Sequence, residues 1–356
     1  VSRNQGWSKI KGNKQMKSFK ILSLGAVALG AAVLAYQPAA YAASDFYKGK
    51  TIRFVVGFGA GGGYDAYSRM LAPRFAKELG AKVLVTNEPG AGGMRALNRV
   101  AIAPGDGLLL HIVNGTGAAM QQIFGVKGKR YDLTKLQYLG IIHSSRWQIL
   151  VTPKSPYKSI ADLIKTDKVF NWASSGRSSM GTGAAVTCHV IGLRCKVVTG
   201  YKGSRKAALA VAQGEMDAMY VSETSADKYH RANSARVIAT MNRKRSVLFP
   251  DVPTVFEQLP NLSKDQKWWI DLHATMESLG RILVAPPNTP KRVVEILRKA
   301  THKILNDPDL IKEANKRRRF IGYQTAAQAR KAVDAVLATP TPAEIKKIKK
   351  LLLETY

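Results

Sequence analysis

Residues 51–65, Thr-Ile-Arg-Phe-Val-Val-Gly-Phe-Gly-Ala-Gly-Gly-Gly-Tyr-Asp, are the stretch of sequence that decides the fold. Residues 51–58 predict a buried strand, residues 59–63 form a glycine loop, and residues 64–79 place apolar side chains at helical spacing. Asp65 stands at the helix entry, where a short acid can cap free backbone N–H groups. This order of strand, glycine loop and helix is typical of a layered α/β domain.

The same unit recurs further along the chain. Residues 82–86 predict a second strand, residues 87–93 a second glycine-rich turn, and a second helix is expected from about Met94. Residues 108–113 predict a third strand, which Asn-Gly-Thr-Gly at 114–117 closes. We therefore expect an open parallel sheet, with a ligand site at the carboxyl ends of its strands.

The pattern restarts near residue 148, which predicts a second α/β lobe. The later strands are expected at 148–152, 169–173, 195–198, 216–221 and 280–285, and the helices at 159–165, 183–192, 207–213 and 291–305. The last stretch, residues 342–354, predicts a basic amphipathic helix that packs on a lobe rather than on a membrane.

The N-terminus has the features of an export signal at residues 16–42. Residues 16–20 are basic, residues 21–35 form an apolar run too short for a comfortable membrane span, and Ala-Tyr-Ala at 40–42 is a small-x-small cleavage site. We expect cleavage near Ala42 and a periplasmic mature chain, with an uncleaved anchor as the alternative. Residues 1–15 are interpreted as an upstream extension outside the fold.

Composition and charge restrict the protein class but leave the partner open. The 356 residues, 46% apolar and 22% charged, are typical of a globular chain long enough for two lobes. A formal net charge of +31 suits nucleic acid, an anionic membrane surface or acidic small molecules. Because Lys and Arg are scattered, with clusters only at 317–319 and 346–350, we expect a solvated basic surface and no nucleic-acid partner.

The chain contains two cysteines, Cys188 in an expected helix and Cys195 at the start of an expected strand. An exported chain meets an oxidising compartment, where a disulfide is allowed. A short bridge and two free buried thiols both fit the sequence. Neither cysteine has metal-ligand spacing around it, and we expect no metal and no cofactor.

The two glycine loops are candidate anion sites. Glycines let a ligand approach the backbone, and the N-terminus of the following helix offers free N–H groups and a partial positive charge. Residues 57–62 also fit the G-x-G-x-x-G pattern of a dinucleotide site. The acid which that pattern requires is represented only by Glu88, inside the second turn, so we favour a small anion over a dinucleotide.

Two other functions stay open as alternatives. Residues 176–181 approach a nucleophile elbow but do not match the G-x-S-x-G spacing, and none of the six histidines pairs with another at ligand spacing. An exported hydrolase would use Ser178 or Ser179. A polyanion- or envelope-binding protein would instead use the high positive charge, and its affinity would fall steeply with salt.

Several stretches, taken in order, resemble the substrate-binding proteins of tripartite tricarboxylate transporters, also called the Bug family. They are Phe-Gly-Ala-Gly-Gly-Gly-Tyr-Asp at 58–65, Asn-Glu-Pro-Gly-Ala-Gly-Gly at 87–93, Tyr-Lys-Gly-Ser at 201–204, Gly-Glu-Met-Asp-Ala at 214–218 and Phe-Pro-Asp-Val-Pro-Thr at 249–254. The resemblance covers residues 46 to 305. The chain departs from the family at Gly59-Ala60, where many members have Ala-Pro.

The resemblance implies a type II-like periplasmic binding-protein fold, with two α/β lobes joined by crossing hinge strands and a ligand cleft between them. Residues 43–147 and 275–356 would form the first lobe, and residues 148–274 the second. It further implies a monomeric protein without enzymatic activity. Such a protein captures a small organic carboxylate and delivers it to a membrane permease of two subunits.

In this family the ligand is held largely by backbone amides and bridging waters. Carried onto this chain, the resemblance implies first-lobe contacts at Gly61, Gly62, Gly63, Tyr64, Gly92, Gly93, Asn114, Gly115 and Thr116. The second-lobe contacts implied are Ser175, Gly176, Ser178, Ser179, Tyr201 and Gly203. Arg177 replaces a small or amide residue, and either pairs with a second carboxylate or points to solvent.

Overall fold

The computed structural model describes residues 46–177 and 180–355, so the expected signal peptide and both Ser178 and Ser179 lie outside the described residues. The chain divides into a unit Val1–Phe46 and a unit Tyr47–Tyr356, and the second unit holds every element named below. In the described ranges, no helix has the length and apolarity that a membrane span requires.

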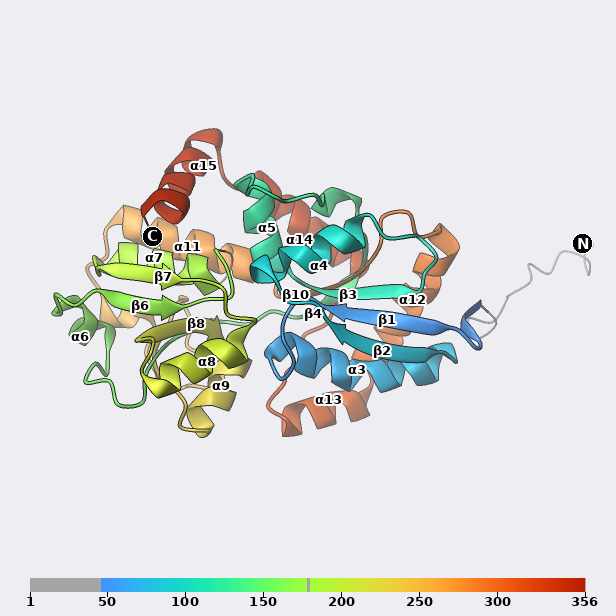
Figure 1. Cartoon of the computed structure of the whole chain (residues 1–356), viewed down its shortest axis with the longest axis horizontal. Helices are drawn as coiled ribbons and strands as arrows, with labels where there is room; N and C mark the ends of the chain where they lie inside the picture. Colours follow the sequence, from blue (N-terminus) through green and yellow to red (C-terminus); the bar gives the residue numbers. More distant parts are fainter. Residues whose placement is uncertain (1–45, 178–179, 356) are drawn as a thin grey trace, which may run out of the picture. The chain divides into compact units, whose positions relative to one another are not determined.

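The first sheet has six strands in the order β11-β4-β10-β3-β1-β2. They are β1 (Thr51–Val56), β2 (Lys82–Asn87), β3 (Leu109–Asn114), β4 (Gln137–His143), β10 (Arg281–Ala285) and β11 (Gln324–Thr325). All of β3 is buried. This burial fits a parallel strand covered on both faces, because α3 (Gly63–Leu79) and α4 (Met94–Ala101) lie on opposite sides of β1 to β3 (Figure 1).

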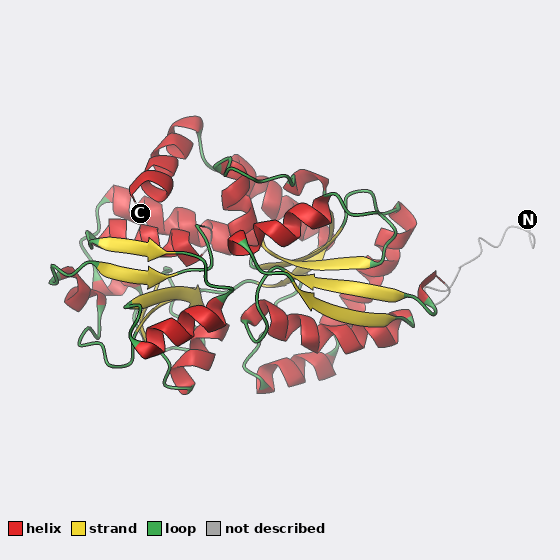
Figure 2. Ribbon diagram, in the orientation of Figure 1, coloured by secondary structure: helices red, strands yellow, loops and turns green. Residues whose placement is uncertain are grey.

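The second sheet has five strands in the order β7-β6-β8-β5-β9. They are β5 (Trp147–Val151), β6 (Phe170–Ala173), β7 (Cys195–Val198), β8 (Ala218–Ser222) and β9 (Arg236–Thr240). Figure 2 shows the two groups of strands, each with its own covering helices. We call the first sheet with its helices the first lobe, and the second sheet with its helices the second lobe. The expected α/β fold with two lobes is confirmed.

The three strands for which an open parallel sheet was expected, β1, β2 and β3, are parallel, but each of the two sheets as a whole is mixed. β10 runs antiparallel to both of its neighbours, β3 and β4, and β5 runs antiparallel to β8 and β9. The chain leaves the first sheet after β4, enters the second at β5, and returns at β10. A strand that arrives from the other lobe enters the sheet from the opposite end. The lobe boundaries near residues 147 and 275 stay predictions, since Tyr47–Tyr356 forms one compact unit.

The remaining helices connect and cover the strands. They are α5 (Gly115–Ile123), α6 (Ile160–Ile164), α7 (Met180–Ile191), α8 (Ser204–Gln213), α9 (Glu223–Arg231), α10 (Val255–Gln258), α11 (Lys264–Glu277), α12 (Lys291–Leu305), α13 (Pro308–Lys316), α14 (Ala326–Ala338) and α15 (Pro342–Lys349), with the 3-10 helices η1 (Ala91–Gly93) and η2 (Leu133–Lys135) and the π-helix η3 (Lys350–Thr355). Helix α3 begins one residue before its predicted start and ends at Gly80, which adopts the left-handed conformation.

The loop expected at residues 114–117 is instead the start of a helix. Asn114 is the N-cap of α5, and its side-chain oxygen accepts a hydrogen bond from the Gly117 N–H at 3.2 Å. An asparagine after a strand can close the strand or cap a helix, and the two glycines that follow favoured the loop. Tertiary packing decides for the helix, because α5 packs against α11 and α14.

The C-terminal helix packs on a lobe, as expected, and that lobe is the second one, although residues 275–356 were expected in the first. Lys347 of α15 forms an ion pair with Asp265 of α11 and lies over the rings of Trp268 and Trp269 at 4.7 and 5.4 Å. Trp268 and Trp269 thus pack against α15.

Cys188 and Cys195 are bridged in the structure, with their Cα atoms 6.2 Å apart. The bridge joins the C-terminal part of α7 to the first residue of β7. Cys188 is fully buried, and the indole N–H of Trp172 donates to the Cys195 sulfur at 3.2 Å. The bridge therefore ties α7, which begins at the cavity described below, to the edge of the second sheet.

We predict that replacing both cysteines by serine lowers the free energy of unfolding by about 2 kcal/mol, since the bridge restricts the unfolded chain over a short loop. Thermal unfolding should detect this loss as a fall in Tm of a few degrees. Dithiothreitol should lower the Tm of the wild type and leave the double variant unchanged. Titration of two free thiols in the non-reduced, unfolded wild type would contradict the bridge.

Candidate functional site

A cavity lies between the two lobes at the carboxyl ends of β1 and β3. It contains about 420 Å³ of space not filled by atoms, open solvent included. Both lobes contribute to its lining, which comprises Phe58, Gly62, Gly63, Tyr64, Asn114, Trp147, Ser175, Met180, Ser204, Val221, Ser222, Ser225 and Arg281.

The first glycine loop leads into the N-terminus of α3. Gly62 is the N-cap and has no side chain, so the first N–H groups of the helix, those of Gly63 and Tyr64, have no side-chain acceptor. Gly62, Gly63 and Tyr64, three of the expected contacts, line the cavity, and their role as ligand contacts stays a prediction. Gly61 is not among the lining residues: its N–H donates to Asp65 Oδ2 at 2.8 Å.

Asp65 therefore acts at the helix entry, as predicted. Burial would raise the pKa of its carboxyl, but hydrogen bonds from the Gly61 N–H and from Arg69 lower it overall. Asp65 is thus ionised in the first turn of α3, where a negative charge is favourable. It fixes the loop conformation and leaves the cavity side of the helix N-terminus to other groups.

Aromatic rings form one wall of the cavity. The rings of Phe58 and Tyr64 are stacked with their centroids 4.7 Å apart, and Trp147 stacks on Tyr220 at 5.3 Å. Burial raises the pKa of Tyr64 to about 12, against the opposing effect of the Arg281 charge. The Tyr64 hydroxyl is therefore neutral at physiological pH, and the wall carries no negative charge.

The second glycine turn lies beside this cavity. Gly92 and Gly93 line a smaller neighbouring space of about 240 Å³ that shares Phe58 and Asn114 with the first cavity. The Gly92 N–H donates to the carbonyl of Ser175 in the second lobe at 3.2 Å. Gly92 and Gly93 thus lie near the site, with Gly92 in contact with the other lobe, and their role as ligand contacts stays a prediction.

Three predicted first-lobe residues lie at the start of α5. Asn114 lines both cavities, whereas Gly115 and Thr116 line neither. The Gly115 N–H donates to the Gly280 carbonyl at 3.0 Å, and the Thr116 hydroxyl donates to the Met276 carbonyl at 3.0 Å. Gly115 and Thr116 therefore hold α5 against the segment that returns from the second lobe.

Of the predicted second-lobe contacts, only Ser175 lines the cavity in the described residues. Gly176 is buried against Gly92, and the side chain of Arg177 is exposed. Ser178 and Ser179 lie outside the described residues. Tyr201 is half-buried and donates its N–H to Ser174, and Gly203 is the N-cap of α8 beside Phe58. Ligand contact by these four described residues, Gly176, Arg177, Tyr201 and Gly203, stays a prediction.

Hydrogen bonds between the lobes enclose the cavity. Gly59 donates its N–H to the Lys202 carbonyl at 2.6 Å, and the Lys228 ammonium donates to the Gly61 carbonyl at 2.9 Å. With the bond from Gly92 to Ser175, these contacts join both glycine loops of the first lobe to the second lobe. The structure is therefore a closed arrangement, in which part of the loop amides serve closure.

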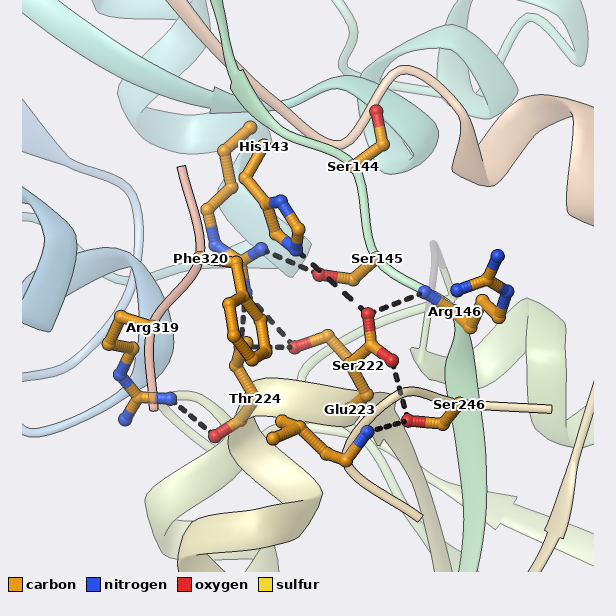
Figure 3. A network of polar contacts seen from close by, with 12 residues as sticks. His143, Ser144, Ser145, Arg146, Ser222, Glu223, Thr224, Ser246, Arg319 and Phe320 are labelled. Atoms are coloured by element: carbon orange, nitrogen blue, oxygen red, sulfur yellow. Dashed lines mark hydrogen bonds and ion pairs between the residues drawn. The ribbon is translucent and has the colours of Figure 1, made fainter. Parts of the chain in front are cut away.

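A buried polar network surrounds the hinge, residues 144–146, between β4 and β5 (Figure 3). Glu223 accepts hydrogen bonds from the Ser246 hydroxyl at 2.5 Å and the Arg146 N–H at 3.4 Å, and lies 3.9 Å from His143 Nε2. Burial raises the pKa of Glu223. Burial, helped by the charges of Arg281 and Arg146, lowers the pKa of His143 to about 3. His143 is therefore neutral at physiological pH.

Sequence reasoning missed Arg281, which begins β10 and lines the cavity. Its side chain is 3% exposed and donates to the hydroxyls of Ser145 and Ser222 at 3.1 and 3.0 Å. The guanidinium lies over the rings of Tyr64 and Tyr67 at 5.2 and 4.7 Å. The available signal was an arginine at the start of an otherwise wholly apolar strand.

Other missed lining residues are Phe58, Trp147, Met180, Ser204, Val221, Ser222 and Ser225. Most of them lie at strand ends or helix starts of the second lobe, where local sequence carries no sign of a ligand site.

The dinucleotide and hydrolase alternatives can be compared with the geometry of the described residues. Glu88 pairs with Arg53 and Arg99, at 3.4 and 2.5 Å. Among the described residues, no serine hydroxyl is hydrogen-bonded to a histidine.

Comparison with known proteins identifies the family. The family model described as the tripartite tricarboxylate transporter family receptor matches residues 67–335, which is more than half of the chain. The chain belongs to this family. The family's proteins are receptors for transporters, which favours the solute-binding interpretation over the hydrolase and polyanion alternatives.

Individual relatives agree with this assignment. A UPF0065 protein from the tcbD-tcbE intergenic region of Pseudomonas sp. is 27% identical and aligns over 87% of this chain and 88% of its own. The protein BugT of Bordetella pertussis is 27% identical over 62% of this chain and 69% of its own. Among solved structures, the periplasmic binding protein BugD superposes with a TM-score of 0.69 at 23% identity, covering 86% of this chain and 98% of its own.

A second structural neighbour, Rpa4515 of R. palustris, was solved with adipate. It has a TM-score of 0.71 at 21% identity, and the match covers 85% of this chain and 97% of that one. These structural likenesses show the periplasmic binding-protein fold.

We predict that Gly59→Ala opens the lobes. A Cβ at this position would lie 2.9 Å from the Lys202 carbonyl oxygen, which is too close for the present contact. Overpacking of this kind costs about 1–3 kcal/mol, enough to shift the closing equilibrium by fivefold or more. Small-angle X-ray scattering should give a larger radius of gyration for the variant than for the wild type.

Lys202→Ala is the matched control, since it keeps the carbonyl that Gly59 contacts and should leave the radius of gyration unchanged. Equal scattering from Gly59→Ala and the wild type would contradict the role of this contact in closure.

Proposed function

We propose that this protein captures a small organic carboxylate in the cavity between its lobes, and that the lobes close around the ligand. The enclosed cavity at the N-terminus of α3, bounded by glycine-loop contacts from both lobes, is the observation that carries the proposal. Free N–H groups at a helix N-terminus bind carboxylates without a basic side chain. Closure around a ligand is the usual motion of two-lobed binding proteins.

Family membership supports the later steps of the proposal. The closed receptor would present its ligand to a membrane permease of two subunits, and it would act in the periplasm as a monomer after cleavage near Ala42. It would need no cofactor, no nucleic acid and no catalytic group. The solved neighbours with malate and with adipate make these two acids the first compounds to test.

We predict that a carboxylate ligand raises the Tm of the mature chain, Ala43 onward. A ligand at about 100 times its Kd should stabilise the folded state by roughly 2.7 kcal/mol. A thermal-shift screen that starts with malate and adipate measures this effect, and the corresponding neutral amides are the controls. A flat response to every carboxylate, together with salt-sensitive binding of heparin, would contradict carboxylate capture and favour the polyanion alternative.

We also predict that the same ligand changes tryptophan fluorescence through Trp147, because this side chain lines the cavity and is 7% exposed. The change should saturate with ligand concentration and should be lost in Trp147→Phe. Trp268→Phe is the matched control, since Trp268 lies on α11 against α15, and it should keep the fluorescence change. A change lost in Trp268→Phe instead would place the ligand elsewhere.

A further inference from the structure

Arg281 is a buried cation that has hydrogen-bond partners but no anionic partner. Its Nη1 donates to Ser145 Oγ at 3.1 Å, and its Nη2 donates to Ser222 Oγ at 3.0 Å and Thr224 Oγ1 at 3.3 Å. Its Nε has no hydrogen-bond partner. All three acceptors are neutral hydroxyls, and Arg281 forms no ion pair within the described part of the chain.

Nearby acids are engaged elsewhere. Buried Asp65 pairs with Arg69, and buried Asp227 pairs with both Arg231 and Arg318. Glu223 is close enough for the Arg281 charge to lower its pKa, but its oxygens bind the Ser246 hydroxyl and the backbone of Arg146. The positive charge of Arg281 is therefore left without a carboxylate.

A buried cation without a counter-ion is unfavourable, because removing it from water costs more than neutral hydroxyls return. The rings of Tyr64 and Tyr67 offset part of this cost by cation–π attraction. A ligand carboxylate would offset the remainder, since planar bidentate pairing of arginine with carboxylate is among the strongest polar interactions in proteins.

The position of the guanidinium fits such a ligand. Arg281 lines the cavity, and its Nη2 lies 3.2 Å from the place where a Cβ on Gly63 would stand. The Ser225 hydroxyl lies 3.0 Å from the same place. The cation thus lies beside the first turn of α3, where backbone N–H groups already favour an anion.

The rest of the cavity is neutral. Its walls are aromatic or aliphatic at Phe58, Tyr64, Trp147, Met180 and Val221, and its other polar lining groups are the backbone of the glycines and the hydroxyl and amide side chains of Ser175, Ser204, Ser222, Ser225 and Asn114. A second carboxylate inside the closed cavity would find no second cation among these lining residues.

We propose that Arg281 is the charge partner of the ligand and determines specificity for a small acid with one buried carboxylate and an apolar body. This inference rests on the proposed capture of a carboxylate and goes beyond it by naming the residue and the ligand class. It differs from recognition by backbone amides alone, because a side chain supplies the charge.

Isothermal titration calorimetry with hexanoate, adipate and hexanamide tests the proposal, since these probes share six carbons and differ in charge. Benzoate and benzamide form a second matched pair. The wild type should bind each monocarboxylate about tenfold or more tightly than its amide, and hexanoate more tightly than adipate. Arg281→Gln should weaken hexanoate by about tenfold or more and leave hexanamide unchanged.

Lys206→Gln is the matched control, because it removes one positive charge from an exposed position of α8 without altering the cavity lining. It should change the hexanoate affinity by less than about threefold, since exposed charges are screened. If circular dichroism shows that Arg281→Gln does not fold, Arg281→Lys carries the test. Its preference for hexanoate over hexanamide should fall severalfold, because the ammonium lacks the planar fork.

The outcomes separate the two proposals. If neither the acids nor the amides bind the wild type, carboxylate capture fails and this inference fails with it. If hexanoate binds the wild type and Arg281→Gln alike, or Arg281→Lys keeps the full preference, the pairing is wrong and carboxylate capture stands. If adipate binds the wild type more tightly than hexanoate, the single-carboxylate class is wrong.

Discussion

The two crossings between the lobes pack backbone against backbone at Gly280, and this contact constrains the rest of the site. A Cβ on Gly280 would lie 2.2 Å from the His143 carbonyl oxygen, and the residue has a φ of +48° that favours glycine. The outgoing crossing after β4 and the returning crossing before β10 can therefore lie side by side. Because they do, Arg281 enters the first sheet between Asn114 and His143, at the carboxyl end of β3. The hinge and the part of the cavity lining at Asn114 and Arg281 thus form one structural feature.

Closure uses backbone amides of the same glycine loops that the resemblance implies as ligand contacts. Gly59 and Gly92 donate N–H groups to the second lobe, so these amides hold the lobes together in the closed arrangement. The helix N-terminus at Gly63 and Tyr64 stays directed at the cavity. A ligand that bridges this helix end and the second-lobe hydroxyls would add to the closing contacts and would in that way couple binding to lobe closure. The buried network of Glu223 and His143 surrounds the hinge between β4 and β5.

Local sequence predicted the elements that depend on local chemistry. The first strand, the glycine loop and α3 were predictable because their hydrophobic spacing, glycines and acidic entry residue lie within one short stretch. The antiparallel return strand was not, since the direction of β10 depends on the path of the chain through the other lobe. Arg281 was missed for the same reason: only long-range pairing brings it opposite Asn114. Cys188 and Cys195 allowed two states, and the approach of α7 to β7 decides between them.

The high net charge of the chain does not by itself explain selectivity for a ligand. Among the described residues most lysines and arginines are exposed, and salt screens their effect beyond about 10 Å. Such charges attract anions of every shape and cannot select one. The guanidinium of Arg281, which is 3% exposed, would instead act in a medium of low polarity and at contact distance from a ligand in the cavity. Under the proposed pairing, selectivity among carboxylates would follow from buried Arg281, and the surface charge would contribute only to the rate of encounter.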